Sequence, residues 1–157
     1  SLEPKRYGGT EGPDPLRMEL GLALEEGLEE ALRRRWGFAR PDEQMTEDGI
    51  AFSPDLLIPE GDGFRVGEIK LTWMSSKGVP RVPDNGLPPK FDKWICQLLF
   101  YCEALGTDLG RIYAFFVNGD YGAHRTPELL AWDFTFTPRE RRENATMLRN
   151  HRKHKGL

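Results

Sequence analysis

Cysteine is scarce in this sequence, which contains only Cys96 and Cys102. The two positions are six apart in a segment with helical periodicity, so their side chains point to different faces. Two cysteines so placed exclude a disulfide framework, a zinc knuckle and a four-cysteine iron–sulphur site.

Long apolar runs are also absent. No segment approaches the roughly 20 apolar residues needed to cross a bilayer, and the N-terminal residues lack the order of a signal peptide. We therefore expect a cytoplasmic protein without a membrane partner.

The charge is unevenly distributed along the 157 residues. The formal net charge is −3, yet positions 139–157 hold five arginines, two lysines and two histidines against two glutamates. A basic segment of this kind is typical of contacts with nucleic-acid phosphates. The length and the 38% hydrophobic content suit one globular domain.

Turn and cap signals divide the chain into segments. Positions 1–13 lack periodicity and predict a flexible lead, followed by a single domain over 14–157 with a basic helix or tail from about 138. Asp14-Pro15 predicts a helix start and Gly37 its end. We expect a buried stripe on this helix, formed by Leu16, Leu20, Ala23, Leu24, Leu28, Ala31 and Leu32.

The remaining periodicity predicts alternating strands and helices. A weak strand is expected at 43–47 and stronger ones at 50–58 and 64–71, with the Gly61-Asp62-Gly63 turn joining the last two as an antiparallel hairpin. A long loop, a helix, two strands and a basic helix follow, at 74–90, 91–105, 112–117, 130–136 and from 138. This order predicts a mixed α/β fold with helices packed on a central sheet.

Two short motifs place acidic groups in the predicted hairpin. Pro54-Asp55 lies in its first strand, and Glu68-Ile69-Lys70 follows thirteen positions after Asp55. Side chains two apart in a strand share a face, so Glu68 and Lys70 point the same way. Charges in the middle of a strand are costly to desolvate unless they are paired or bind a metal.

The Asp55 and Glu68 carboxylates, with the Ile69 backbone carbonyl, form an all-oxygen ligand set that suits Mg²⁺ or Mn²⁺. Such an ion activates water and stabilises charge on a phosphate, while Lys70 could orient that water or neutralise the transition state. Hydrolysis of a phosphodiester is the expected chemistry. The alternative is that Glu68 and Lys70 form a solvated pair on an edge strand and that Asp55 is a turn residue.

This arrangement resembles the PD-(D/E)XK nuclease superfamily. The resemblance implies a restriction-endonuclease-like αβββαβ core with a mixed sheet flanked by helices. It also implies that Asp55, Glu68 and Lys70 are catalytic.

A further motif lies on the second predicted helix. Gln97 and Tyr101 are four apart and therefore share a helix face. Gln-x-x-x-Tyr after a Glu-x-Lys strand is similar to the motif of the RecB, AddB and lambda-exonuclease-like branch, which includes phage enzymes, and this likeness implies contact with the substrate strand. Lys93, one turn earlier, is expected to add a phosphate contact. Core packing is the alternative for Gln97 and Tyr101.

The same branch implies a fourth metal ligand on the first helix, preceded four residues earlier by glycine. Gly21 and Glu25 fit this spacing. Helical geometry does not distinguish Glu25 from Glu30, and a solvated acidic face formed by Glu25, Glu26, Glu29 and Glu30 remains the alternative.

We therefore expect a Mg²⁺-dependent DNA exonuclease that acts in recombination, repair or phage DNA processing. Arg149, Arg152 and Lys153 are expected to contact DNA phosphates. A structure-specific or nicking endonuclease with the same centre and an inactive nucleic-acid-binding module are the competing interpretations. A second copy of the chain and a recombination protein are further partners that the resemblance allows.

Overall fold

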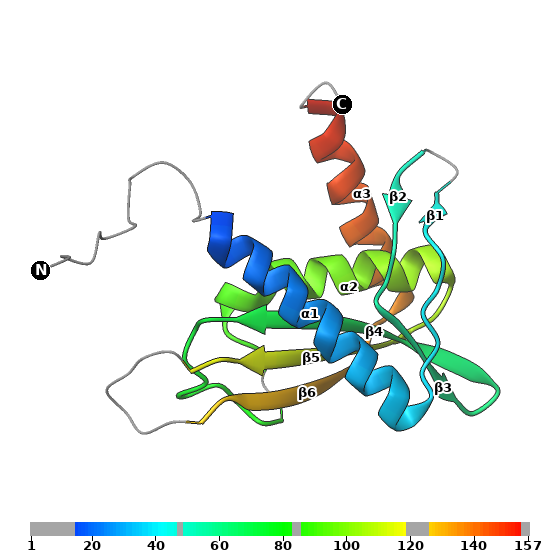
Figure 1. Cartoon of the computed structure of the whole chain (residues 1–157). Helices are drawn as coiled ribbons and strands as arrows, with labels where there is room; N and C mark the ends of the chain where they lie inside the picture. Colours follow the sequence, from blue (N-terminus) through cyan, green and yellow to red (C-terminus); the bar gives the residue numbers. More distant parts are fainter. Residues whose placement is uncertain (1–14, 47–48, 83–85, 119–125, 155–157) are drawn as a thin grey trace, which may run out of the picture.

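The computed structural model describes residues 15–46, 49–82, 86–118 and 126–154, and its centre is a four-stranded sheet (Figure 1). The outer pairs are antiparallel and the central pair is parallel, so the sheet is mixed. In spatial order the strands are β3 (Leu56–Glu60), β4 (Gly63–Thr72), β5 (Leu109–Phe116) and β6 (Glu128–Thr135).

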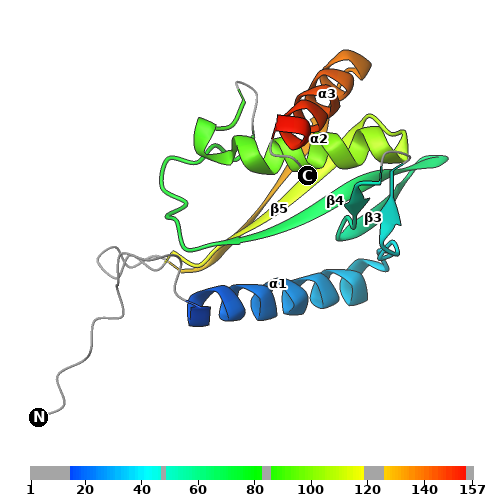
Figure 2. The ribbon, with the colours of Figure 1, turned by 90° about the horizontal axis from the view of Figure 1, so that it is seen from above.

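Helices cover both faces of this sheet. Seen from above, α1 lies on one side of the sheet and α2 with α3 on the other (Figure 2). The prediction of an α/β fold with a mixed sheet between helices is therefore confirmed. The helical segments are α1 (Pro15–Trp36), the short 3-10 helix η1 (Pro89–Phe91), α2 (Asp92–Leu105) and α3 (Pro138–His154).

The ends of the helices follow from their capping residues. Gly37 and Gly106 both have a positive φ, 69° and 68°, and their N–H groups donate to carbonyls of the last turns of α1 and α2. Thr137 caps α3: its hydroxyl accepts the Glu140 N–H, and the Glu140 carboxylate accepts the Thr137 N–H. This reciprocal pair is a capping box.

The core on the α2 face depends on one close approach. Gly110 on β5 packs against Leu98 of α2, and a Cβ at position 110 would lie 2.7 Å from Leu98 Cδ2. Leu98 is fully buried with Phe91, Phe116 and Trp132. A glycine at 110 therefore lets α2 lie close to the sheet.

The predicted stripe of α1 is wrong for the N-terminal half of the helix and for Ala31. Leu32 is buried and Leu28 is partly buried, but Leu16, Leu20 and Leu24 are 71%, 45% and 40% exposed, and Ala23 and Ala31 are exposed too. Of the described side chains of α1, Leu28 and Leu32 belong to the buried cluster beneath the helix. Helical periodicity identified the apolar face but not how far the sheet extends beneath it.

The strand predicted at 50–58 is interrupted. Ala51–Phe52 (β2) pairs with Gln44–Met45 (β1) in a separate ribbon, and β3 begins only at Leu56. Pro54, which lies between them, has no N–H to donate to a sheet. The predicted strand at 43–47 is reduced to β1, and positions 47–48 lie outside the described residues.

Two other boundaries also differ. β5 begins three residues before the predicted position 112, and β6 spans Glu128–Thr135 rather than 130–136. Leu109, Gly110 and Arg111 pair with β6, and the Arg111 side chain forms an ion pair with Asp133 on that strand. Pairing between strands therefore extends β5 beyond its apolar run.

No helix in the described parts of the chain is both long enough and apolar enough to span a membrane.

Candidate active site

The candidate site begins where β3 leaves β4. Leu56 pairs with Gly67 at the end of the two paired strands. If the pairing continued, Pro54 would lie opposite Ile69, the next residue of β4 whose N–H and C=O point toward β3. The Ile69 N–H instead donates to Asp55 Oδ2 at 2.6 Å. Beyond it, the Leu71 N–H donates to Glu25 Oε1 at 3.0 Å. Two carboxylates thus take the place of the missing strand.

The same break affects the Ile69 carbonyl. In an extended strand the N–H and C=O of one residue point to the same edge, so this carbonyl faces the side from which β3 has departed. Pro54, the residue opposite in register, has no N–H to donate to it. The proline of the Pro54-Asp55 motif therefore leaves a backbone oxygen beside the Asp55 carboxylate.

Glu68 and Lys70 lie on the α2 face of β4. Glu68 is 2% exposed, and its Oε1 accepts a hydrogen bond from Lys70 Nζ at 2.5 Å. The second oxygen, Oε2, is buried and has no hydrogen-bond partner among the residues that the structure describes. An unpaired buried carboxylate oxygen is costly, and such groups commonly mark a ligand position. A solvated pair does not describe this geometry, because Glu68 is buried and Lys70 also donates to Gln97 of α2.

The carboxylates repel one another in this buried setting. Burial, followed by the charge of Asp55, raises the pKa of Glu68 to about 8, although Lys70 acts in the opposite direction. Burial also raises the pKa of Asp55, while the hydrogen bond from Ile69 opposes the rise. Glu25 and Glu29 add repulsion at Asp55. A cation bound here would relieve this repulsion.

The second helix connects directly to this pair. Lys70 Nζ donates to Gln97 Oε1 at 2.8 Å, and Gln97 Nε2 donates to Tyr101 Oη at 2.8 Å. Burial raises the pKa of the Tyr101 hydroxyl, with the Glu68 charge as the next cause. The Gln-x-x-x-Tyr motif therefore extends the polar network from β4 onto α2.

A metal ion fits the donor chemistry of this site. Asp55, Glu68 and the Ile69 carbonyl are hard oxygen donors, and Glu68 Oε2 is without a partner. The described residues contain no group of three or more His, Cys, Asp or Glu side chains already arranged around a metal position. Mg²⁺ usually binds through one or two carboxylates with waters and substrate phosphates, so such a group is not required.

The fold has a solved counterpart. It is similar to the crystal structure of SSO0001, with a TM-score of 0.54 and 19% sequence identity, over 87% of this chain and 57% of that chain. This chain therefore corresponds to little more than half of that protein. No family model matches the sequence, and no curated protein matches it. The likeness establishes the architecture alone.

The remaining predicted substrate residues lie apart from this network. Lys93 is exposed on α2 and lines a groove next to α3. Arg149 and Arg152 are exposed on α3. Lys153 belongs to α3, but its side chain lies outside the described residues.

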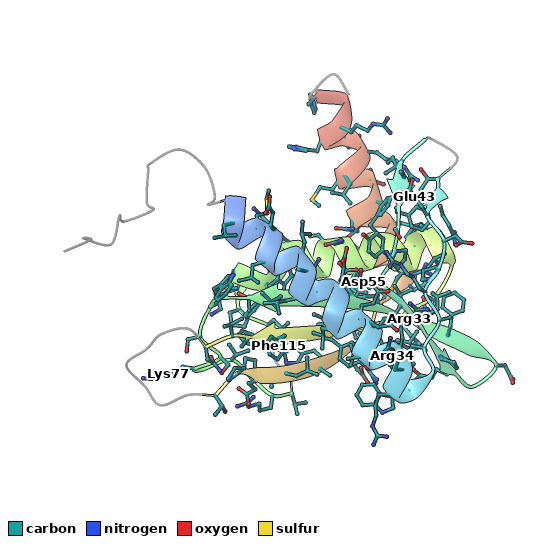
Figure 3. All side chains as sticks on the ribbon, viewed as in Figure 1. Arg33, Arg34, Glu43, Asp55, Lys77 and Phe115 are labelled. Atoms are coloured by element: carbon teal, nitrogen blue, oxygen red, sulfur yellow. The ribbon has the colours of Figure 1, made fainter. Side chains whose placement is uncertain are left out.

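Figure 3 shows Asp55 near the middle of the molecule, while Glu43, next to β1, lies toward its upper right.

Glu29 is a site neighbour that the sequence analysis did not single out. It is buried, its charge influences Asp55, and it forms ion pairs with Arg40 at 3.5 Å and Arg33 at 3.9 Å. The interpretation of a solvated acidic face is therefore wrong for Glu29, whereas Glu26 and Glu30 are exposed. Its spacing of four from Glu25 was the available signal, because such residues share a helix face.

Proposed function

We propose that this chain is a Mg²⁺-dependent deoxyribonuclease of the PD-(D/E)XK kind, acting from DNA ends like the RecB and lambda-exonuclease-like branch. The observation that carries the proposal is the buried Glu68 carboxylate near Asp55, which has one oxygen on Lys70 and one without a partner in the described part of the chain. A mid-strand acid in this state suits a cation and a phosphate better than it suits packing.

Asp55, Glu68 and the Ile69 carbonyl would hold the ion, with Glu25 at the margin through its contact with Leu71. When bound, Mg²⁺ supplies a Lewis acid for the scissile phosphate and a water of lowered pKa. Mn²⁺ has the same ligand preference.

Lys70 is held in place by two acceptors, Glu68 and Gln97. An ammonium group fixed in this way can neutralise charge that develops on the phosphate oxygens or orient the attacking water. Gln97 positions Lys70 directly, and Tyr101 fixes the orientation of the Gln97 amide. Substrate contact by Gln97 and Tyr101 is part of the same proposal.

The basic side chains of helix α3 favour a polyanionic substrate. Arg149 and Arg152 are exposed on this helix, and α3 lies on the α2 side of the sheet (Figure 2). Lys70 reaches Gln97 of α2 on the same side. Cations at this position would bind DNA phosphates without reading sequence. An enzyme of this kind acts where DNA is, so a cytoplasmic location and a recombination or repair role belong to the proposal.

A non-catalytic nucleic-acid-binding module is the second candidate. Two observations favour it: Lys70 occupies Glu68 Oε1, and the described residues contain no group of three or more His, Cys, Asp or Glu side chains that could hold a metal ion. An endonuclease with the same centre differs from the leading proposal only in its mode of attack.

One experiment separates these candidates. Linear DNA labelled at either end and closed circular DNA are incubated with the protein, with Mg²⁺ or with EDTA, and with Glu68→Gln as the control. Degradation of linear DNA alone supports the exonuclease, and nicking of circles supports the endonuclease. A mobility shift without Mg²⁺-dependent cleavage contradicts both and supports the binding module.

A further inference from the structure

A groove of about 610 Å³ lies between β2, α2 and α3. In Figure 1, α3 and β2 rise above α2, and all three elements contribute lining residues. The volume lies in the range of small-molecule sites, roughly 300–1,000 Å³. The lining residues used below are Phe52, Lys93, Gln97, Tyr101, Met147 and His151.

The deep part of the groove is aromatic and apolar. Phe52 stacks with Tyr101 at a centroid distance of 6.1 Å and meets Phe100 edge-on at 6.0 Å. Met147, which is 50% exposed, stands on the α3 wall. Such a surface suits a flat, apolar ring, because nucleobases stack on aromatic side chains whatever their sequence.

The groove and the candidate active site share a wall. Gln97 and Tyr101 line the groove, and Gln97 also accepts the hydrogen bond from Lys70. A strand whose phosphate contacts Lys70 therefore passes the groove within its neighbouring nucleotides.

Charged side chains of both signs line the groove, and α3 carries exposed arginines beside it. Lys93 and His151 line it, and α3 exposes Arg149 and Arg152 in the same segment of helix. Among the described lining residues, Asp92 carries the single negative charge. Exposed arginines on α3 beside an aromatic floor complement a polyanion that carries flat rings. An apolar helix of a protein partner would match the floor but not these arginines.

We propose that this groove binds one unstacked nucleobase of the DNA strand, next to a phosphate that contacts Lys70. The protein would then engage single-stranded or frayed ends and would bind fully paired blunt ends less well, because a paired base must first leave its stack. This inference rests on the proposed function and extends it by naming the form of DNA that is bound.

Binding without cleavage tests the groove. The full chain is titrated in EDTA against a fluorescent oligothymidylate, and then against oligonucleotides with a single abasic site moved along the strand. Anisotropy should show one position at which loss of the base weakens binding roughly tenfold or more. Uniform affinity at every abasic position would overturn the proposal.

Variants that fill the groove with a large side chain can be compared with a variant that carries the same side chain outside it. Ala51→Trp on β2 and Met147→Trp on α3 place an indole in the groove from opposite walls, so the test survives if one variant fails to fold. Either folded variant should lose the dependence on abasic position. Leu129→Trp on β6, at a site 39% exposed outside the groove, should retain it. Position dependence that persists in both filled variants would contradict the assignment.

A cleavage assay on the same oligonucleotides with Mg²⁺ tests the proposed nuclease activity separately from the nucleobase groove. Base-dependent binding without cleavage supports the groove and contradicts the nuclease. Cleavage without base-dependent binding supports the nuclease and contradicts the nucleobase groove. If oligonucleotides do not bind but an acidic amphipathic peptide does, and Ala51→Trp abolishes that binding, the groove is a protein-docking site and the proposal is overturned.

Discussion

Lys70 Nζ donates a hydrogen bond to Gln97 Oε1 at 2.8 Å, across the interface between β4 and α2. The contact joins two motifs that lie twenty-seven positions apart in the sequence. It gives Lys70 a neutral acceptor in addition to the Glu68 carboxylate, and therefore a fixed direction. The position of α2 is consequently part of the geometry of the candidate site.

The proposed centre predicts a large loss of turnover in isosteric variants. Asp55→Asn and Glu68→Gln should each lower Mg²⁺-dependent cleavage by at least ~10³, because a ligand to the ion loses its charge. Asparagine at 55 can still accept the Ile69 N–H, so the fold should persist. Single-turnover assays at saturating Mg²⁺ measure the loss. Glu26→Gln on the exposed face of α1 is the matched control, and near wild-type turnover in Glu68→Gln would refute the centre.

The contact with Gln97 predicts a separate kinetic effect. Gln97→Ala should reduce turnover by about 10², since Lys70 loses the partner that fixes its direction. Tyr101→Phe should have a smaller effect, because Gln97 still reaches Lys70. Mg²⁺ affinity and the melting temperature should change little. Calorimetry and cleavage on the same samples decide the matter: a lower melting temperature with unaltered turnover would show a packing role only.

The raised pKa of Glu68 predicts that stability falls as pH rises. Its folded pKa of about 8 exceeds the ordinary value of 4.5, so between these limits the folded state binds more protons than the unfolded state. Glu68 therefore contributes stability fully below about pH 4.5, and this contribution is lost as pH rises through 8. The contribution of Asp55 to stability also decreases as pH rises, because its pKa is raised in the folded state as well.

Denaturant unfolding in EDTA at a series of pH values measures this dependence. Glu68→Gln should reduce the slope and be more stable than the wild type at pH 8. Glu26→Gln should keep the wild-type slope. A wild-type free energy of unfolding that rises between pH 5 and 8 would contradict the assigned state of Glu68.

The basic face of α3 predicts a salt-dependent contribution to DNA affinity. Replacing Arg149 and Arg152 by glutamine should lower the slope of log K against log salt by up to about 1.8 for duplex DNA, two phosphates' worth. Arg34→Gln with Arg35→Gln removes the same charge from α1, on the opposite face of the sheet, and serves as the control. Equal slopes in both double variants would show that α3 is a solvated helix.

The close approach of α2 to the sheet predicts a packing effect. Gly110→Ala places a methyl group 2.7 Å from Leu98 Cδ2 and should cost about 1–3 kcal/mol of the free energy of unfolding. Gly27→Ala on α1, where a Cβ meets nothing within 4 Å, should instead be neutral or stabilising. Denaturant titration of the two variants gives the comparison, and an unperturbed Gly110→Ala would show that Leu98 moves freely.

Local signals were enough to predict part of this architecture. Pro15 and Gly37 set the limits of α1, and the Gly61-Asp62-Gly63 turn joins β3 to β4 as predicted. The shared face of Glu68 and Lys70 follows from strand geometry. These features depend on neighbours in the sequence, which is why the sequence alone could indicate them.

Long-range features were not accessible in this way. The hydrogen bonds from Ile69 to Asp55 and from Leu71 to Glu25 depend on where β3 ends and on the position of α1 above it. The exposure of Leu16 and Leu20 likewise depends on the extent of the buried cluster under the helix. Periodicity describes which residues share a face, but it does not describe what lies opposite them.

The departure of β3 from β4 also bears on aggregation. Beyond Gly67, the edge of β4 offers backbone N–H groups that another chain could pair with as an added strand. Asp55 and Glu25 occupy the N–H groups of Ile69 and Leu71 and place negative charge along that edge. The acids proposed to bind the ion therefore also protect an open strand against intermolecular pairing, which links the chemistry of the site to the solubility of the chain.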